Sequence, residues 1–293
     1  ATSSANLTMA NNSSLTGNLI NVDSVTLNAS SLTGDYTISD GRSASLTLQN
    51  GANLAGNLIN IDSVTLTDGA LTGDYTISDS RTASLTLQDG ASLTGNLVNV
   101  DSATLDASSL TGDYTISDGR NARLALQNAA RFTGNLNNVG GIVLAGESIW
   151  NMVASNSVGA MSINDSSVKF GSANEFFQLD VGTLAGNGTF LMDVDFATNQ
   201  HDLLNVTGVA TGTHSLVIPG SGVDPASPEQ LTVVRTGGGD ATFALAGASV
   251  VDVGTYSYAL NSVANGTGTD WFLDPSTKTI SPGTRSVLAL FNT

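Results

Sequence analysis

The stretch SLTGDYTISDGRSASLTLQN, residues 31–50, occurs three times in this chain with few changes. It returns as ALTGDYTISDSRTASLTLQD at residues 70–89 and as SLTGDYTISDGRNARLALQN at residues 109–128. Each copy begins 39 residues after the one before it, without insertion. A constant spacing over several copies indicates stacked structural units, because each unit then meets an equivalent neighbour.

Each repeat divides again into two similar halves. SLTGNL begins at Ser14 and SLTGDY at Ser31, which gives halves of 17 and 22 residues within the 39-residue repeat. YTIS and SLTLQ alternate apolar and polar residues, the period of a β-strand. Asn, Asp, Gly and Ser separate these segments and indicate turns. A half-repeat therefore holds three short strands and three turns.

Such a unit cannot bury its own apolar side chains, but a stack of units can. Parallel pairing of equivalent strands would place Leu46 near Leu85 and Leu124, two coils apart, with other aliphatic residues between them. The sequence therefore predicts an all-β fold, a right-handed single-stranded parallel β-helix with a C-terminal β cap. We expect about seven coils over residues 1–139, two coils to each repeat.

Stacking also turns each repeated polar residue into a column. A structural interpretation gives Asp40, Asp79 and Asp118 turn and ion-pair roles beside the arginine two positions later. The alternative is a repeated recognition surface for a repetitive partner. The candidate surface ladder comprises Asp35, Tyr36, Asp40, Arg42, Asp74, Tyr75, Asp79, Arg81, Asp113, Tyr114, Asp118 and Arg120.

Composition excludes several classes of function. Charged residues make up 12% of the 293 residues and the formal net charge is −16, which argues against nucleic acid and anionic membrane surfaces as partners. The absence of cysteine excludes disulfides and thiol catalysis. The sequence contains no apolar run of 18 residues, so it predicts no membrane-spanning helix. The first residues lack a signal core, so we expect either a removed signal or an internal fragment.

The inventory of catalytic groups is poor. His201 and His214 are the only histidines, and no G-x-S-x-G motif is present. The aspartates recur with the repeat instead of clustering at one level, and the nonapeptide calcium repeat is absent. We expect no catalytic residue, metal site or cofactor, and no enzyme activity. A polysaccharide lyase on the same fold is the remaining enzymatic alternative.

Beyond Val139 the repeat stops, and the residues resemble a known family. SIWNMVASNSVGAMSINDSSVKF, residues 148–170, is similar to a coil of the pertactin-like bacterial autotransporter passengers. That coil begins with Ser-x-Trp-x-Met and runs into Val-Gly-x-Leu. The matching residues are Ser148, Trp150, Met152, Val158 and Gly159, while Met161 stands where the family has Leu.

The resemblance continues downstream through LDVGTLAGNGTFLMDVDF at residues 179–196 and HDLLNVTGVATGTHSLVI at residues 201–218. LTVVRTGGGDATFALA, VDVGTYSYAL and DWFLDP follow in the family order. In the family this region is called the autochaperone or junction, and it folds first and templates the preceding coils. The residues that the resemblance assigns to this folding role are Trp150, Leu184, Gly186, Gly188, Phe190, Asp202, Leu204, Val206, Gly208, Tyr256 and Trp271.

The resemblance implies a division of the chain into four parts. These are the β-helix at 1–139, transition coils at 140–173, an autochaperone-type cap at 174–273, and the start of a linker at 274–293. That linker would lead to a translocator barrel that the sequence does not contain. GSGVDPASPEQ, residues 220–230, is expected to form a loop that protrudes from the cap.

The resemblance also implies a location and a function. We expect export through the periplasm and outer membrane to the bacterial cell surface, and adhesion, self-association or biofilm formation there. The partners would be molecules of a host or neighbouring cell surface, or a second copy of the chain. The alternative is a passive stalk that carries an effector domain N-terminal to these residues, because the repeats have no binding loops between coils.

Overall fold

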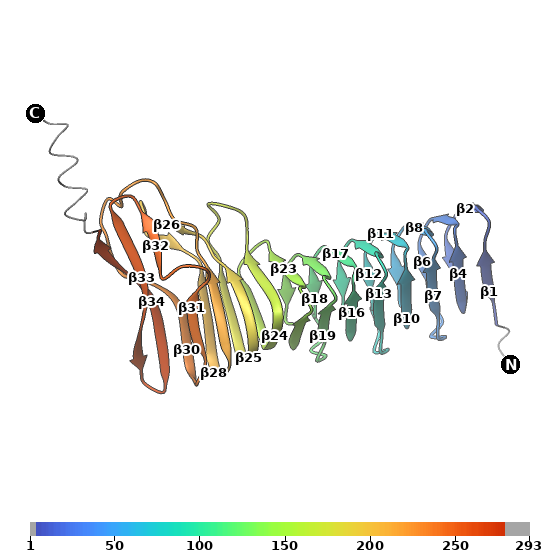
Figure 1. Cartoon of the computed structure of the whole chain (residues 1–293). Coiled ribbons are helices and arrows are strands. Elements are labelled where there is room, and N and C mark those ends of the chain that lie inside the picture. The colour runs from blue at the N-terminus through green and yellow to red at the C-terminus, as the bar shows by residue number, and fades with distance from the viewer. Residues whose placement is uncertain (1–3, 279–293) are drawn as a thin grey trace, which may run out of the picture.

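The computed structural model describes residues 4–278. Figure 1 shows coils stacked along one axis, from β1 near the N-terminus to β33 and β34 at the opposite end. Strands up to residue 217 pair in parallel across the stack, with the short β26–β27 hairpin as the exception. This confirms the predicted parallel β-helix.

Each coil of the repeat region contributes one strand to each of three faces. The first face contains β1 (Asn6–Met9), β4 (Ser24–Asn28), β7 (Ser45–Gln49), β10 (Ser63–Thr67), β13 (Ser84–Gln88), β16 (Ser102–Asp106), β19 (Arg123–Gln127) and β22 (Gly141–Ala145). The second contains β2 (Ser14–Thr16), β5 (Ser31–Thr33), β8 (Asn53–Ala55), β11 (Ala70–Thr72), β14 (Ser92–Thr94), β17 (Ser109–Thr111), β20 (Arg131–Thr133) and β23 (Ile149–Met152). The third contains β3 (Leu19–Ile20), β6 (Tyr36–Thr37), β9 (Leu58–Ile59), β12 (Tyr75–Thr76), β15 (Leu97–Val98), β18 (Tyr114–Thr115) and β21 (Leu136–Asn137).

The register across the first face is the one expected from the repeat. Leu46 pairs with Val64, Val64 with Leu85, Leu85 with Ala103, and Ala103 with Leu124. Seven first-face strands, β1 to β19, precede residue 139 in the described part of the chain, as predicted. Apart from the partly buried Leu7 in the terminal strand β1, the inward side chains on this face are almost fully buried and form one continuous aliphatic core. Burial of this apolar surface is the main force that holds the coils together.

The two halves of the repeat differ at the corner between the third and first faces. In the short half, β3 ends at Ile20 and β4 begins at Ser24. In the long half, β6 ends at Thr37 and β7 begins only at Ser45. The extra residues of the long half therefore form a loop, and that loop carries the Asp-x-Arg triplet.

A column of glycines marks the corner between the second and third faces. Gly34 has a φ of +142°, and a Cβ there would lie 2.3 Å from the carbonyl oxygen of Gly17. Gly95 repeats this arrangement against Gly73, with a φ of +147° and a Cβ–oxygen distance of 2.1 Å. Only glycine permits both the backbone conformation and the close approach of successive coils. The recurrence of Thr-Gly-Asn and Thr-Gly-Asp follows from this requirement.

After the repeats, the strands become longer. They are β24 (Asn156–Phe170), β25 (Gln178–Leu191), β26 (Val194–Asp195), β27 (Gln200–His201), β28 (Leu203–Ala210) and β29 (Thr213–Val217). β24 pairs with β22 through Ala160–Asn164 and with β23 through Ser167–Phe170. One strand thus continues around a corner that the earlier coils turn with separate strands, and a β-bulge at Asp165 accommodates the bend.

At the C-terminal end the pairing direction reverses. The strands there are β30 (Leu231–Gly239), β31 (Thr242–Leu245), β32 (Val250–Val253), β33 (Tyr256–Asn265) and β34 (Gly268–Thr277). β30 is parallel to β28 but antiparallel to β34, and β33 is antiparallel to both β34 and β32. These antiparallel strands cover one face of the last parallel coil, where bare backbone groups would otherwise remain.

The predicted linker at 274–293 begins too early. β34 extends to Thr277, so residues 274–277 belong to the antiparallel sheet, and most of the remaining linker lies outside the described residues. Residues 220–230 form the expected loop, apart from a β-bridge between Ser221 and Val253. Within residues 4–278 no helix is long and apolar enough to cross a membrane.

Candidate functional site

The repeated arginines act as clamps between coils. The Arg81 Nε donates to Asp79 Oδ1 at 2.9 Å, and Nη1 lies 3.2 Å from Asp62 Oδ2 on the preceding coil. Nη1 also donates to the carbonyl oxygen of Arg42 at 3.1 Å, in the equivalent loop two coils away. Arg120 forms the corresponding contacts with Asp118, at 2.6 Å, and Asp101, at 2.8 Å.

These contacts leave little of each arginine for a partner. The exposed fractions of the side chains are 23% for Arg42, 9% for Arg81 and 11% for Arg120. Hydrogen bonds from the arginines lower the pKa of Asp40, Asp79 and Asp118 below their usual value. The turn and ion-pair roles expected for these aspartates are therefore present.

The tyrosines of the predicted surface ladder lie inside the β-helix. Tyr36, Tyr75 and Tyr114 are fully buried. Their hydroxyls donate to the carbonyl oxygens of Val22, Ile61 and Val100 at 2.6, 2.5 and 2.6 Å. Burial raises the pKa of all three phenols. The prediction of tyrosines on the surface is wrong, and the alternation in YTIS already places Tyr36 on the same side as the apolar Ile38.

Asp35, Asp74 and Asp113 belong to a ladder that also includes asparagines missed at the sequence level. The backbone N–H of Asp35 donates to Asn18 Oδ1 at 3.0 Å, and that of Asn57 donates to Asp35 Oδ1 at 2.8 Å. Asp74, Asn96, Asp113 and Asn135 continue the pattern. Alternation of Asn and Asp keeps like charges on neighbouring coils apart. The alternation of Gly-Asn and Gly-Asp in the sequence is the signal for this ladder.

A second amide column lies at the next corner. Asn60 has a φ of +60°, a left-handed conformation that asparagine tolerates better than most residues. Its Nδ2 donates to the carbonyl oxygen of Ile38 at 3.3 Å, and its Oδ1 accepts from the backbone N–H of Ser78 at 2.8 Å. Asn99 repeats both contacts one repeat later. These residues therefore hold the backbone of adjacent coils.

The outward surface of the first face carries regular hydroxyl columns. One consists of Ser24, Ser45, Ser63, Ser84 and Ser102, and the next of Thr26, Thr47, Thr65, Thr86 and Thr104. Members of a column are paired residues on neighbouring strands, so they recur about every 4.8 Å along the stack. In these five coils the two columns contain no charged residue. The surface can donate and accept hydrogen bonds at a fixed period.

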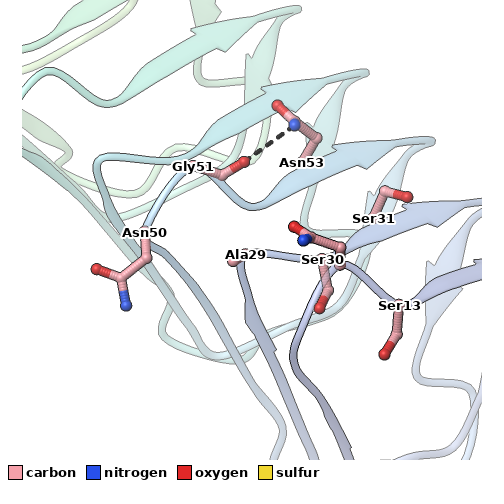
Figure 2. Close-up of a pocket in the computed structure, with 8 residues that line it drawn as sticks. Ser13, Ala29, Ser30, Ser31, Asn50, Gly51 and Asn53 are labelled. Atoms are coloured by element: carbon pink, nitrogen blue, oxygen red, sulfur yellow. Dashed lines mark hydrogen bonds between the residues drawn. The ribbon is translucent and has the colours of Figure 1, made fainter.

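A shallow depression of about 250 Å³ lies near the N-terminal end of the described coils. Figure 2 shows hydroxyl, amide and backbone groups around it, including Ser13, Ser31, Asn50 and Asn53. No charged residue lines it. Among residues 4–278, no group of three or more His, Asp and Glu could hold a metal ion.

The residues that the resemblance assigns to folding lie mostly in the core of the C-terminal half. Trp150 is fully buried, its Nε1 donates to the carbonyl oxygen of Gly134 at 2.9 Å, and its ring stacks on Phe132. Leu184, Phe190, Leu204, Val206 and Trp271 are also buried. Tyr256 is partly buried. A Cβ at Gly186, Gly188 or Gly208 would lie within 2.5 Å of atoms of the preceding coil.

Asp202 and His214 are buried polar groups near the C-terminal end. Asp202 Oδ1 accepts from the backbone N–H of Phe177 and Oδ2 from that of Asp193, both at 2.7 Å. Burial raises the pKa of Asp202 to about 7. His214 packs between Phe190 and Phe243, and burial lowers its pKa. His201 Nδ1 lies 3.0 Å from the carbonyl oxygen of Asn199. Neither histidine forms a catalytic arrangement with a serine among the described hydrogen bonds.

Comparison with known protein families gives a match in the C-terminal half. Residues 158–275 match the family described as Pertactin. The autotransporter adhesin/invasin TibA of Escherichia coli O78:H11 is 36% identical over 145 residues, 46% of this chain and 14% of TibA. The pertactin autotransporter of Bordetella bronchiseptica is 42% identical over 130 residues, 42% of this chain and 14% of that protein. The chain thus spans a small part of these relatives.

Solved structures share the fold over nearly the whole chain. The Haemophilus influenzae Hap adhesin matches 93% of this chain and 33% of its own, with a TM-score of 0.70 and 21% identity. The autotransporter UpaB from E. coli strain CFT073 matches 94% of this chain and 84% of its own, with a TM-score of 0.53 and 17% identity. At these identities the likeness concerns the fold alone.

Proposed function

We propose that this chain, a pertactin-like autotransporter passenger domain, acts as an adhesive scaffold on the bacterial cell surface. Passengers of this kind are exported through the outer membrane and displayed on the cell or released. TibA is named an adhesin/invasin and Hap an adhesin, which supports an adhesive role for a chain that is similar to TibA in sequence and to Hap in fold. The binding partner would be a host surface, a neighbouring cell or a second copy.

The regular hydroxyl columns of the first face are the observation that carries this proposal. Outward Ser and Thr side chains stand at a constant period over five coils, without charged residues between them. A partner with its own polar repeat could form many weak hydrogen bonds at once, so the total affinity would grow with the number of coils. A second copy packed side by side offers such a repeat.

The C-terminal strands would serve secretion rather than adhesion. β30, β34 and β33 form an antiparallel sheet whose apolar residues, such as Trp271 and Leu273, pack into the end of the core. We infer that this cap folds early and presents a formed edge on which the preceding coils assemble. The long strands β24 and β25 would form next on this edge and would in turn offer a formed edge to the coils of the repeat region.

The test is an aggregation assay on cells that display the chain through a translocator barrel. Lysine at Thr47, Thr65 and Thr86 would place charges along the centre of the hydroxyl array without touching the core. We expect cells with the native chain to clump or coat a surface, and cells with the lysine variant to do so much less at equal display. Lysine at Thr94, Thr111 and Thr133, which lie on the second face, is the matched control.

A passive stalk is the second candidate, favoured by the short connections between most strands of the repeat region. It predicts equal clumping by cells that display residues 1–293 and cells that display residues 140–293, provided both are displayed equally. A difference that depends on the first-face threonines would contradict the stalk. If cells with all of these variants clump equally, the proposal of an adhesive scaffold is wrong.

A further inference from the structure

The corner between the first and second faces alternates between long and short turns. Ala29 and Ser30 alone join β4 to β5, whereas residues 50–52 join β7 to β8. The later repeats keep this alternation, with short turns at 68–69 and 107–108 and long turns at 89–91 and 128–130. Each short turn therefore lies between two longer ones, which leaves a notch at every second coil.

The backbone of these turns repeats as regularly as their length. Each short turn has one left-handed residue, with a φ of +46° at Ala29, +50° at Asp68 and +47° at Ala107. Each long turn of the repeats has two in succession, at Asn50–Gly51, Asp89–Gly90 and Asn128–Ala129. The second residue of each short turn is small and buried, namely Ser30, Gly69 and Ser108. The three notches thus share one backbone geometry, at a period of 39 residues.

The first notch is the depression of about 250 Å³ in Figure 2. The Asn53 Nδ2 donates to the Gly51 carbonyl oxygen at 3.0 Å, and the Asn50 Nδ2 donates to Asn28 Oδ1 at 2.9 Å. The Oδ1 atoms of Asn50 and Asn53 and the Ser31 hydroxyl have no hydrogen-bond partner within residues 4–278. An uncharged site with free acceptors and a free hydroxyl favours a ligand whose groups both donate and accept.

The spacing of the notches along the stack limits the class of ligand. Notches two coils apart recur at about 9.6 Å, twice the strand spacing, whereas an extended peptide repeats its side-chain direction at about 6.6 Å. A polyproline helix repeats at about 9.3 Å, but its usual sites are lined by aromatic residues. No aromatic residue lines the first notch.

Charge narrows the class further. Asp68 and Asp89 lie at the second notch, and the formal net charge is −16, so an anionic polymer is disfavoured. In an extended chain of β-linked hexoses, every second sugar faces the same way, and the hydroxyl groups both donate and accept hydrogen bonds. Such a neutral polysaccharide matches the polar groups of the notch and its recurrence at every second coil.

We propose that the three notches bind a neutral, extended polysaccharide that lies along this corner, with one disaccharide unit at each notch. Equivalent residues at the start of β5, β11 and β17 would flank the ligand at the three levels, namely Ser31, Ala70 and Ser109. Each notch would contribute a weak contact, so the affinity should rise with the length of the sugar chain until all three are filled. This site is distinct from the hydroxyl columns of the first face.

The test is the binding of fluorescently labelled chitohexaose and cellohexaose to the full chain, followed by fluorescence polarisation. We expect at least one hexasaccharide to bind about tenfold more tightly than its disaccharide. Isoleucine at Ser31, Ala70 and Ser109 fills the notches and should weaken this binding about tenfold. Isoleucine at Thr33, Thr72 and Thr111, at the other ends of the same strands, is the matched control and should leave it unchanged.

Several results would overturn the proposal. These are no binding of either hexasaccharide, equal affinity for disaccharide and hexasaccharide, or equal losses in the two triple variants when both melt like the parent. Tighter binding of heparin or of a decaproline peptide would assign the notches to an anionic polymer or to a peptide instead. Because the readout is binding to the purified chain and not clumping of cells, this proposal can fail while the adhesive scaffold stands.

Discussion

The repeat region and the C-terminal cap solve the same packing problem by different means. Over residues 14–137 the coils are nearly identical, and small turns hold them through backbone N–H groups, amides and the arginine clamps. From Asn156 onward the strands are longer, and Phe190, Phe243, Trp271 and His214 form a connected aromatic cluster. The difference shows that repeated coils extend the β-helix, whereas a core of large, non-repeated side chains closes its C-terminal end.

The largest expected effect is on the cap's aromatic cluster. Phe190→Ala removes a fully buried ring in contact with His214 and Phe243, and should cost about 3–5 kcal/mol. Leu85→Ala in the repeat should cost about 2–5 kcal/mol. If the cap templates the coils, Phe190→Ala alone will slow refolding of the whole chain in stopped-flow denaturant dilution. Equal slowing by both variants would contradict a special role for the cap.

The glycine column gives the next effect. Gly73 has a φ of +142°, and a Cβ would lie 2.2 Å from the Gly56 carbonyl oxygen, so Gly73→Ala should cost about 3 kcal/mol. Gly90 has a φ of +84° with open space around it, so Gly90→Ala should cost about 1 kcal/mol through backbone strain alone. Urea unfolding monitored by circular dichroism measures both. Equal losses of stability in the two variants would mean that the close contact between successive coils at Gly73 does not add to the cost of backbone strain.

A smaller difference in stability between the repeat region and the cap is expected when a buried tyrosine in each is replaced by phenylalanine. Tyr75→Phe leaves the Ile61 carbonyl without the hydroxyl that donates to it at 2.5 Å, and should cost about 1–2 kcal/mol. The Tyr258 hydroxyl is buried without a hydrogen-bond partner in the described residues, so Tyr258→Phe should be neutral or stabilising. Thermal unfolding of the two variants checks the contrast. A loss of stability in Tyr258→Phe would reveal a missing partner in the cap.

The smallest effects concern pH, and the two regions should respond with opposite sign. The pKa of Asp79 is lowered by Arg81, so its contribution is present above the ordinary value of 3.8 and is lost as the pH falls below it. The pKa of Asp202 is raised to about 7 by burial, so its contribution is present at low pH and is lost as the pH rises through about 7.

Stability measured from acid to mildly alkaline pH tests both signs. Asp202→Asn should remove the loss of stability near neutral pH without changing the loss at acid pH. Asp79→Asn should reduce the loss of stability at acid pH without changing the loss near neutral pH. A neutral decline that persists in Asp202→Asn would assign it to another group.

The resemblance pointed to the family whose model matches residues 158–275, and the repeat itself predicted most of the fold. A 39-residue period with strand alternation allows parallel stacking, and the register through Leu46, Leu85 and Leu124 follows from it. The candidate ladder was predicted less well. Arg42, Arg81 and Arg120 recur as expected, but their contacts with carbonyl oxygens two coils away depend on how far each loop extends.

What the sequence by itself determined is therefore periodic: the alternation of the strands, the number of coils and the spacing at which each residue recurs. What only the tertiary structure decided is how each column is used. Tyr36 points inward to Val22, Asp62 joins Arg81 to the Ala44 N–H, and β34 reverses direction on β30. The physical reason is that alternation depends on one strand alone. These contacts depend instead on the distance between coils and on the shape of the open C-terminal end of the stack.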